Sequence, residues 1–239
     1  MKKELHDTAH TEKKTGILYI VSTPIGNLRD ITYRAVDTLQ SVSLIAAEDT
    51  RRASIVARRY EITTPFISYF EHNARRRIPE LMKRLHNKED IALISDAGTP
   101  GISDPGYLLI RRCIEESVPV VAVPGATAFV AALSVSGLPT NRFLFEGFLP
   151  VKKGRKKRLE ALAHEERTII LYESPHRIER TAAELLLHCG NREVAIVREI
   201  TKLYEEVIRT RLADAVELFK VHKPRGEYVL IIHGADTTP

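Results

Sequence analysis

Tryptophan is absent from the 239-residue chain, and only 6% of its residues are aromatic. Proteins that bind single-stranded nucleic acid often stack its bases on aromatic side chains, so no large platform of this kind is expected here. Cysteine is also scarce, because Cys113 and Cys189 are too few for a disulfide framework or a cysteine-rich zinc site. No apolar run approaches the ~18–20 residues of a membrane span. We therefore predict two reduced thiols and no contact with a membrane.

Several common catalytic motifs are missing as well. The chain contains no Gly-x-Gly, no GxxxxGK phosphate loop, no HExxH and no GxSxG. Nucleotide hydrolases, ordinary dinucleotide oxidoreductases, zincins and α/β-hydrolases are therefore disfavoured. The nine histidines show no metal-ligand spacing, so no metal site is predicted.

The composition that remains is that of a folded, weakly basic protein. Hydrophobic residues make up 44%, charged residues 28%, and the formal net charge is +5, which excludes a disordered chain. Residues 1–15 hold too few apolar side chains for the core of a signal peptide. We predict a flexible tail there and a cytoplasmic location.

The first half of the chain alternates apolar strands with amphipathic helices. Strands are predicted over 17–22, 44–47, 66–69, 91–95 and 118–123, each followed by a helical segment. Asp30 is the predicted N-cap of the first helix, and Asp49 or Thr50 begins the second. Unbroken apolar strands with short connections favour a mainly parallel sheet covered on both faces.

The alternation of predicted strands and helices begins again at Phe143, with more strands per helix. Strands are predicted over 143–148, 168–172, 193–198, 204–210 and 228–232. This pattern indicates a second α/β domain with a mixed sheet. The Gly137 to Asn141 stretch breaks the pattern, so the predicted domains are 16–138 and 139–239.

Two loops at strand ends predict a ligand site. The Asp96 to Gly106 loop follows a buried strand and holds three Gly and two Pro in eleven residues, which makes it stiff yet open to a ligand at its backbone. A similar loop, Pro124 to Thr127, follows the next strand. Open α/β sheets bind ligands at the carboxyl ends of their strands, so we expect a ligand cleft here.

The residues of these loops belong to a wider resemblance. The segments LYIVSTPIGNLRDIT, LIAAEDTR, ALISDAGTPGISDPG, VPGATAFVAAL, FEGFLP, YESPHR and RGEYVLII resemble the tetrapyrrole-methylase-like S-adenosylmethionine methyltransferases. Within that superfamily they are most similar to the branch that 2′-O-methylates cytidine in 16S ribosomal RNA of the small subunit. The resemblance implies two α/β domains, a methyl donor in the cleft between them, and a homodimer.

The resemblance also assigns residues to the donor, S-adenosyl-L-methionine. In the first half of the chain it implies Pro24, Asp96, Ser103, Asp104, Pro105 and Gly106. From the next loop it implies Ala126, Thr127 and Ala128, although relatives often have Pro where this chain has Ala126. In the second domain it implies Phe148, Tyr172, Gly226, Glu227 and Tyr228.

The reaction that the resemblance implies is an in-line attack of a 2′-hydroxyl on the methyl group of a sulfonium. Positioning and exclusion of water supply much of the rate, and a base helps to remove the hydroxyl proton. The candidate bases are Glu48, Asp49, Glu173 and His176, all at predicted strand ends. Each has an alternative role: Asp49 as a helix cap, Glu173 in an ion pair with Arg177, and His176 as a loop residue.

Basic side chains predict how the RNA is held. Arg51 and Arg177 are candidates for bidentate contacts to phosphate. The Lys152 to Arg158 segment holds six basic residues in seven, and we predict that it binds the RNA backbone. The residues in question are Lys152, Lys153, Arg155, Lys156, Lys157 and Arg158. A solvated helix face is the alternative.

Two other functions remain open at this point. A methylase of a corrin or sirohaem precursor would share the donor site, and basic charge suits its polycarboxylate substrate. A non-catalytic RNA-binding assembly protein would need the basic surface without the donor loops. The EDTR and YESPHR segments favour the RNA-methylating branch, with 16S ribosomal RNA, within a small-subunit particle, as the partner.

Overall fold

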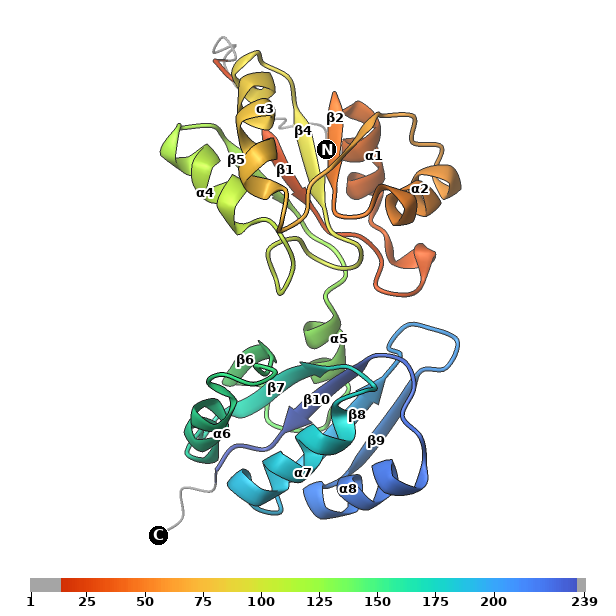
Figure 1. The fold of residues 1–239 in the computed structure, drawn as a ribbon. Coiled ribbons are helices and arrows are strands. Elements are labelled where there is room, and N and C mark those ends of the chain that lie inside the picture. The colour runs from red at the N-terminus through yellow and green to blue at the C-terminus, as the bar shows by residue number, and fades with distance from the viewer. Residues whose placement is uncertain (1–13, 236–239) are drawn as a thin grey trace, which may run out of the picture. The chain divides into compact units, whose positions relative to one another are not determined.

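The computed structural model describes residues 14–235 and divides into two compact units (Figure 1). Most of the predicted N-terminal tail lies outside the described residues. The first unit comprises the chain up to Ser22 together with Thr32–Pro124. The second comprises Thr23–Ile31 and the chain from Gly125 onward. Each unit is built around its own sheet.

The first unit has a five-stranded, all-parallel sheet in the order β3-β2-β4-β1-β5. Its strands are β1 (Leu18–Val21), β2 (Leu44–Ala47), β3 (Phe66–Ser68), β4 (Ile91–Ile94) and β5 (Val120–Val123). Every residue of β2 and β4 is buried. Strands covered on both faces show continuous apolar sequence rather than alternation, so the predicted parallel sheet is confirmed.

Helices return the chain between these strands. They are α1 (Tyr33–Ser41), α2 (Thr50–Arg59), α3 (Ala74–His86) and α4 (Tyr107–Glu115). Leu81 and Leu85 of α3 and Leu109 and Cys113 of α4 share one buried cluster with side chains of the sheet. Figure 1 shows α1 and α2 on the other side of the sheet, so both faces are covered.

The second unit has a five-stranded mixed sheet in the order β6-β7-β10-β8-β9. Its strands are β6 (Phe143–Phe148), β7 (Thr168–Glu173), β8 (Glu193–Arg198), β9 (Glu206–Arg211) and β10 (Tyr228–Ile232). Only β6 and β7 run parallel, and the other neighbours are antiparallel. The mixed sheet predicted for this half is therefore confirmed.

The two faces of the second sheet are covered by different helices. Leu230 and Ile232 join the core under α6 (Arg155–Ala163), α7 (Ile178–Cys189) and α8 (Leu212–Val221). Val229 and Ile231 point to the opposite face, where α5 (Ala128–Ser134) lies. This is the two-residue period of a strand.

The position of α5 explains where the chain divides. The pattern of predicted strands and helices places the domain boundary near Gly137 to Asn141, whereas the compact units separate between Pro124 and Gly125. Ala132 and Leu133 of α5 are buried against the second sheet, so this helix packs with the strands that follow it. Helix periodicity does not show which sheet an apolar face will cover.

The first helix begins later than predicted, and the prediction that Asp30 caps it is wrong. Asp30 ends a short 3₁₀ helix, η1 (Leu28–Asp30). Thr32 is the N-cap instead, because its extended backbone lets its hydroxyl accept a hydrogen bond from the Ala35 amide at 3.1 Å. Within residues 14–235, no helix is long and apolar enough to cross a membrane. Cys113 and Cys189 are both free thiols.

Candidate functional site

The adjacent strands β2 and β4 bring four carboxylates together in the first unit. The Asp49 amide donates to Asp96 Oδ1 at 3.0 Å, and the Asp96 amide donates to Glu48 Oε2 at 3.3 Å. Asp104, from the loop that follows β4, is also close enough to feel the charges of Glu48 and Asp96. Parallel strands end at the same edge of a sheet, so residues that follow different strands meet there.

These carboxylates differ in how easily they take a proton. Burial raises the pKa of Asp104 to about 6, against a hydrogen bond with Ser95 that lowers it. Burial also raises the pKa of Glu48. In contrast, hydrogen bonds from Arg51 lower the pKa of Asp49 to about 2. Asp49 is therefore the weaker base of the two, and Glu48 is better suited to accept a proton.

Arg51 and Arg52 follow this cluster at the start of α2. The Arg51 amide donates to Asp49 Oδ1 at 2.9 Å, so Asp49 is the N-cap of the helix, as one of the two alternatives predicted. The Arg51 side chain is 89% exposed and pairs with Asp49 at 2.6 Å. Arg52 pairs with Asp96 at 3.3 Å. Arg51 thus remains accessible to an external phosphate.

The Asp96 to Gly106 loop has the backbone geometry that its composition predicts. Gly98, Gly101 and Ser103 all have positive φ, at 86°, 84° and 61°. At Gly106 an added Cβ would lie 3.1 Å from the Gly101 amide nitrogen, so two parts of the loop pack against each other. Ser103 is exposed, while Asp104 and Pro105 are half-buried. The loop is therefore a tight, folded-back structure.

In the second unit, aromatic side chains gather beside the start of α5. The Phe129 amide donates to Tyr172 Oη at 3.0 Å, next to Ala128. The rings of Phe148 and Tyr172 are 5.6 Å apart, and Phe148 is 53% exposed. Ala126 and Thr127 are half-buried just before α5. These predicted donor residues therefore form one neighbourhood.

Gly226 and Glu227 belong to a second neighbourhood of that unit. Gly226 has a φ of 82°, and an added Cβ would lie 2.5 Å from Cγ of Glu199. Glu199 Oε1 accepts from the Glu227 amide at 3.0 Å and from Lys202 Nζ at 2.7 Å. The Tyr228 ring packs edge-on against Phe219 of α8, on the helix-covered face opposite Tyr172. The Tyr228 side chain therefore lies on the other face of the sheet from Tyr172, although both residues were predicted to line the donor.

The Thr23–Ile31 segment, which contains Pro24, packs in the same second unit. Pro24 is buried. At Gly26 an added Cβ would lie 2.8 Å from Thr201 Oγ1 and 3.2 Å from the Ile200 carbonyl oxygen. Glu199 and Thr201 themselves have positive φ, at 49° and 65°. Sequence reasoning missed this loop, because neither residue type signals a left-handed backbone.

The basic side chains of the segment after β6 do not all lie on the protein surface. Five of its six basic side chains are exposed, namely Lys152, Lys153, Lys156, Lys157 and Arg158. Arg155 is only 4% exposed, and its guanidinium binds Glu184 and Thr181. The spacing of Arg155, Leu159 and Leu162, all buried, marks one helix face and is the signal that would have revealed this.

Glu173 and Arg177 lie in the same buried network, while His176 is exposed. Glu173 Oε2 accepts from Thr181 Oγ1 at 2.7 Å, and Oε1 accepts from the Ser174 amide at 2.9 Å. Arg177 Nε lies 3.2 Å from Glu173 Oε1, which is the ion pair that the sequence analysis gave as the alternative role of Glu173. Both Glu173 oxygens are thus occupied.

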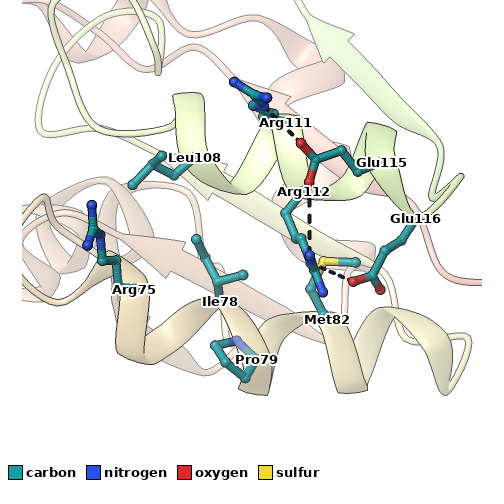
Figure 2. Close-up of a pocket in the computed structure, with 9 residues that line it drawn as sticks. All are labelled: Arg75, Ile78, Pro79, Met82, Leu108, Arg111, Arg112, Glu115 and Glu116. Carbon is teal, nitrogen blue, oxygen red and sulfur yellow. Dashed lines mark hydrogen bonds and ion pairs between the residues drawn. The ribbon is translucent and has the colours of Figure 1, made fainter.

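A groove of about 440 Å³ lies elsewhere on the first unit, between α3 and α4 (Figure 2). Ile78, Pro79 and Met82 from α3 face Leu108 from α4 across it. Arg112 pairs with Glu115 and Glu116 at its other end. None of the predicted site residues lines this groove, so it does not mark the predicted donor site.

Metal ligands do not gather among residues 14–235, where no group of three His, Cys, Asp or Glu side chains is arranged to hold an ion. The residues that carry chemistry are carboxylates, aromatic rings and backbone amides. Such groups suit an organic ligand with positive charge and hydroxyl groups.

Comparison with known proteins completes the description of the site. Residues 17–216 match the family model "Tetrapyrrole (Corrin/Porphyrin) Methylases". The ribosomal RNA small subunit methyltransferase I of Synechocystis is 52% identical over 222 residues, covering 92% of this chain and 80% of that protein. The protein of the same name from Thermotoga maritima is 45% identical, covering 92% of this chain and 100% of that protein.

A solved structure shows the same fold. The uroporphyrin-III C-methyltransferase of Thermus thermophilus, complexed with S-adenosylhomocysteine, has a TM-score of 0.65 at 19% sequence identity. The alignment covers 91% of this chain and 97% of that one. At this identity the likeness establishes the architecture alone.

Proposed function

The chain belongs to the tetrapyrrole (corrin/porphyrin) methylase family, and on that basis we propose that it is an S-adenosylmethionine-dependent methyltransferase of small-subunit ribosomal RNA. The observation that carries the proposal is the identity of 45% and 52%, over 92% of this chain, to two proteins named ribosomal RNA small subunit methyltransferase I. The tetrapyrrole methylase compared above is only 19% identical. The methylated group is the 2′-hydroxyl of a cytidine ribose, as the motif resemblance implies.

The chemistry of the predicted donor residues in each unit supports the proposal. In the first unit, Asp96 and Asp104 present carboxylates to a cationic donor with ribose hydroxyls, on a loop whose backbone is already folded tightly. In the second unit, Phe148 and Tyr172 offer apolar surface beside the backbone of Ala126 to Ala128. When bound, S-adenosylmethionine supplies an activated methyl group.

Glu48 is the side chain best suited to accept the proton of the attacking hydroxyl. Its pKa is raised by burial, whereas that of Asp49 is held at about 2 by Arg51. Glu173 is committed to Thr181, Ser174 and Arg177. A Glu48→Gln variant is expected to lose ~10²–10⁴-fold in the rate of methyl transfer while binding the donor. Full activity in that variant would refute the role of Glu48, and His176→Ala would then be the next variant to measure.

The exposed lysines of the 152–157 segment and Arg51 are proposed to hold the RNA backbone. Contacts of this kind orient the substrate without reading its sequence. The protein acts as a homodimer on a small-subunit particle in the cytoplasm. Light scattering at micromolar concentration tests the dimer, which has about twice the mass of the 27.0 kDa chain. A fully active monomer at that concentration would contradict it.

Methyl transfer to defined acceptors tests the function itself. The protein is incubated with labelled S-adenosylmethionine and one of three acceptors: small ribosomal subunits, naked 16S ribosomal RNA, or uroporphyrinogen III. Label in the RNA, mapped to one cytidine 2′-oxygen, is the expected result. Label in the tetrapyrrole alone would establish the rival methylase. Tight RNA binding without donor binding in calorimetry would establish a non-catalytic assembly protein.

The donor loop is tested separately at Gly101. Its φ of 84° is a conformation that a branched residue adopts only with strain, although there is space for a Cβ beside Ile110. Gly101→Val is therefore expected to distort the loop and abolish donor binding while circular dichroism shows a folded protein. Unchanged donor affinity in the folded variant would exclude this loop from the donor site.

A further inference from the structure

Two arginine side chains bind backbone carbonyls of the segment between β6 and α6. Arg177 Nη2 donates to the Leu149 carbonyl oxygen at 2.6 Å, and Arg155 Nη1 donates to the Pro150 carbonyl oxygen at 3.1 Å. These carbonyls are consecutive and follow the end of β6 directly. Leu149 is 2% exposed, whereas the chain from Val151 to Gly154 is exposed. The two guanidiniums therefore set the point at which the chain leaves the core.

Each guanidinium is fixed by further contacts within the second unit. Arg155 donates from Nε to Glu184 Oε2 and from Nη2 to Thr181 Oγ1, both at 2.7 Å. The Thr181 hydroxyl in turn donates a hydrogen bond to Glu173 Oε2, and Glu173 pairs with Arg177. The chain of contacts closes on itself and links α6, α7 and β7.

A network of this kind is a weak source of stability, because taking charges out of water offsets most of their attraction. The network instead orients its members, because a planar guanidinium that donates to several fixed partners at once is held in one orientation. Through the Leu149 and Pro150 carbonyls the network also contacts the backbone that leads into the exposed Val151 to Gly154 stretch. Phe148 before it is already held by strand pairing with Tyr172, so the network acts on what comes after.

We infer that Arg155 and Arg177 are positioning residues that clamp the Leu149 and Pro150 carbonyls and so aim Lys152 and Lys153 at the RNA backbone. Arg155 has no face open to phosphate, so its own positive charge is used inside the protein. This inference rests on the proposed function for the identity of the ligand, but the clamp itself does not depend on it.

The chain offers a matched pair of substitutions to test the clamp. Arg155 and Arg180 both bind Glu184, at 2.7 Å and 2.9 Å, but only Arg155 also holds a carbonyl of the segment. Arg155→Lys keeps the charge and removes the fork of donors. Arg180→Lys makes the same change at an exposed position. Arg177→Lys releases the Leu149 carbonyl and leaves the Pro150 carbonyl bound to Arg155. This variant replaces Arg155→Lys in the test if Arg155→Lys does not fold.

Two readouts separate the clamp from the proposed function. Hydrogen exchange of the amides of residues 155 and 158, which donate to the Lys152 and Gly154 carbonyl oxygens at 3.3 Å and 3.0 Å, is expected to accelerate in Arg155→Lys and Arg177→Lys. It is expected to stay as in the unmodified protein in Arg180→Lys. The KM for small ribosomal subunits is expected to rise about tenfold, the equivalent of one charge-assisted contact, with donor affinity unchanged.

Three results would overturn the inference. Unchanged hydrogen exchange in both clamp variants would show that the carbonyl contacts do not hold the segment. Faster exchange with unchanged KM would show that its position does not matter for RNA. An equal rise in KM for Arg180→Lys would assign the effect to Glu184 alone. If the unmodified protein methylates no RNA, the proposed function fails, whereas the exchange result still decides whether the clamp exists.

Discussion

Replacing Gly226 by alanine is expected to destabilise the second unit by more than the cost of placing an alanine in a left-handed backbone conformation. The φ of Gly226 is 82°, which costs an L-residue about 1–2 kcal/mol. In addition, the new Cβ would lie 2.5 Å from Cγ and 2.7 Å from Oε1 of Glu199. Side-chain carbon atoms do not approach so closely, so Glu199 must move.

Moving Glu199 breaks two hydrogen bonds that it accepts. They come from Lys202 Nζ at 2.7 Å and from the Glu227 amide at 3.0 Å. Because these groups are partly exposed, we expect their loss to add only about 1–2 kcal/mol. Gly226→Ala should therefore lower the free energy of unfolding by about 2–4 kcal/mol in total.

Gly154→Ala is the matched control in the same unit. Its φ is 84°, and an added Cβ would meet nothing within 4 Å. It should lose only the conformational contribution of about 1–2 kcal/mol. Urea unfolding followed by circular dichroism measures both variants. Equal destabilisation of the two would refute the reasoning, because it would mean that Glu199 swings aside without loss.

Three further outcomes are expected elsewhere. The pKa of Asp104 is raised to about 6, so the folded state binds more protons than the unfolded state between about pH 4 and 6, and stability falls as the pH rises through that window. Asp104→Asn should therefore gain in Tm over the unmodified protein as the pH rises from 4.5 to 7.5; a constant difference would contradict this. Tyr172→Phe removes the acceptor of the Phe129 amide and should cost about 1 kcal/mol in urea unfolding, whereas no loss would mean that water replaces the hydroxyl. Replacing four lysines by Glu should weaken RNA binding, namely Lys152, Lys153, Lys156 and Lys157. The dependence of RNA affinity on salt should become less steep, by at most ~0.9 per lost contact, while donor affinity stays unchanged. Unchanged RNA binding would make the segment a solvated helix face.

The strands and the start of α2 could be predicted from the sequence because their causes are local. A run such as Ile91–Ile94 is short, has no polar position and is followed by a loop rich in Gly and Pro, which is typical of a strand buried on both faces. Asp49 caps α2 through the amide two residues ahead, a contact that needs no distant partner. The tight backbone of the Asp96 to Gly106 loop likewise follows from its own glycines and prolines.

Strand order decided which of the predicted site residues meet. The sequence between Glu48 and Asp96 does not show that β2 lies beside β4, yet this pairing creates the carboxylate cluster. Burial raises the pKa of Asp104, and the nearby charges of Glu48 and Asp96 raise it further. Strand order also places Tyr228, whose ring faces α8 because of where β10 enters its sheet. Pairing between distant strands depends on the packing of the whole unit, which local pattern does not encode.

The sequence by itself determined two α/β halves, the Gly- and Pro-rich loop that follows β4 and a basic segment after Phe148. Only the tertiary structure decided that Arg155 of that segment turns inward, since a charge run looks uniform until the helix phase and a buried partner are known. It also decided that α5 packs with the second sheet and that Glu173 is enclosed. The physical reason is common to all three. Burial is a property of the assembled core, and a residue's own neighbours in the chain do not set which side chains the core will enclose.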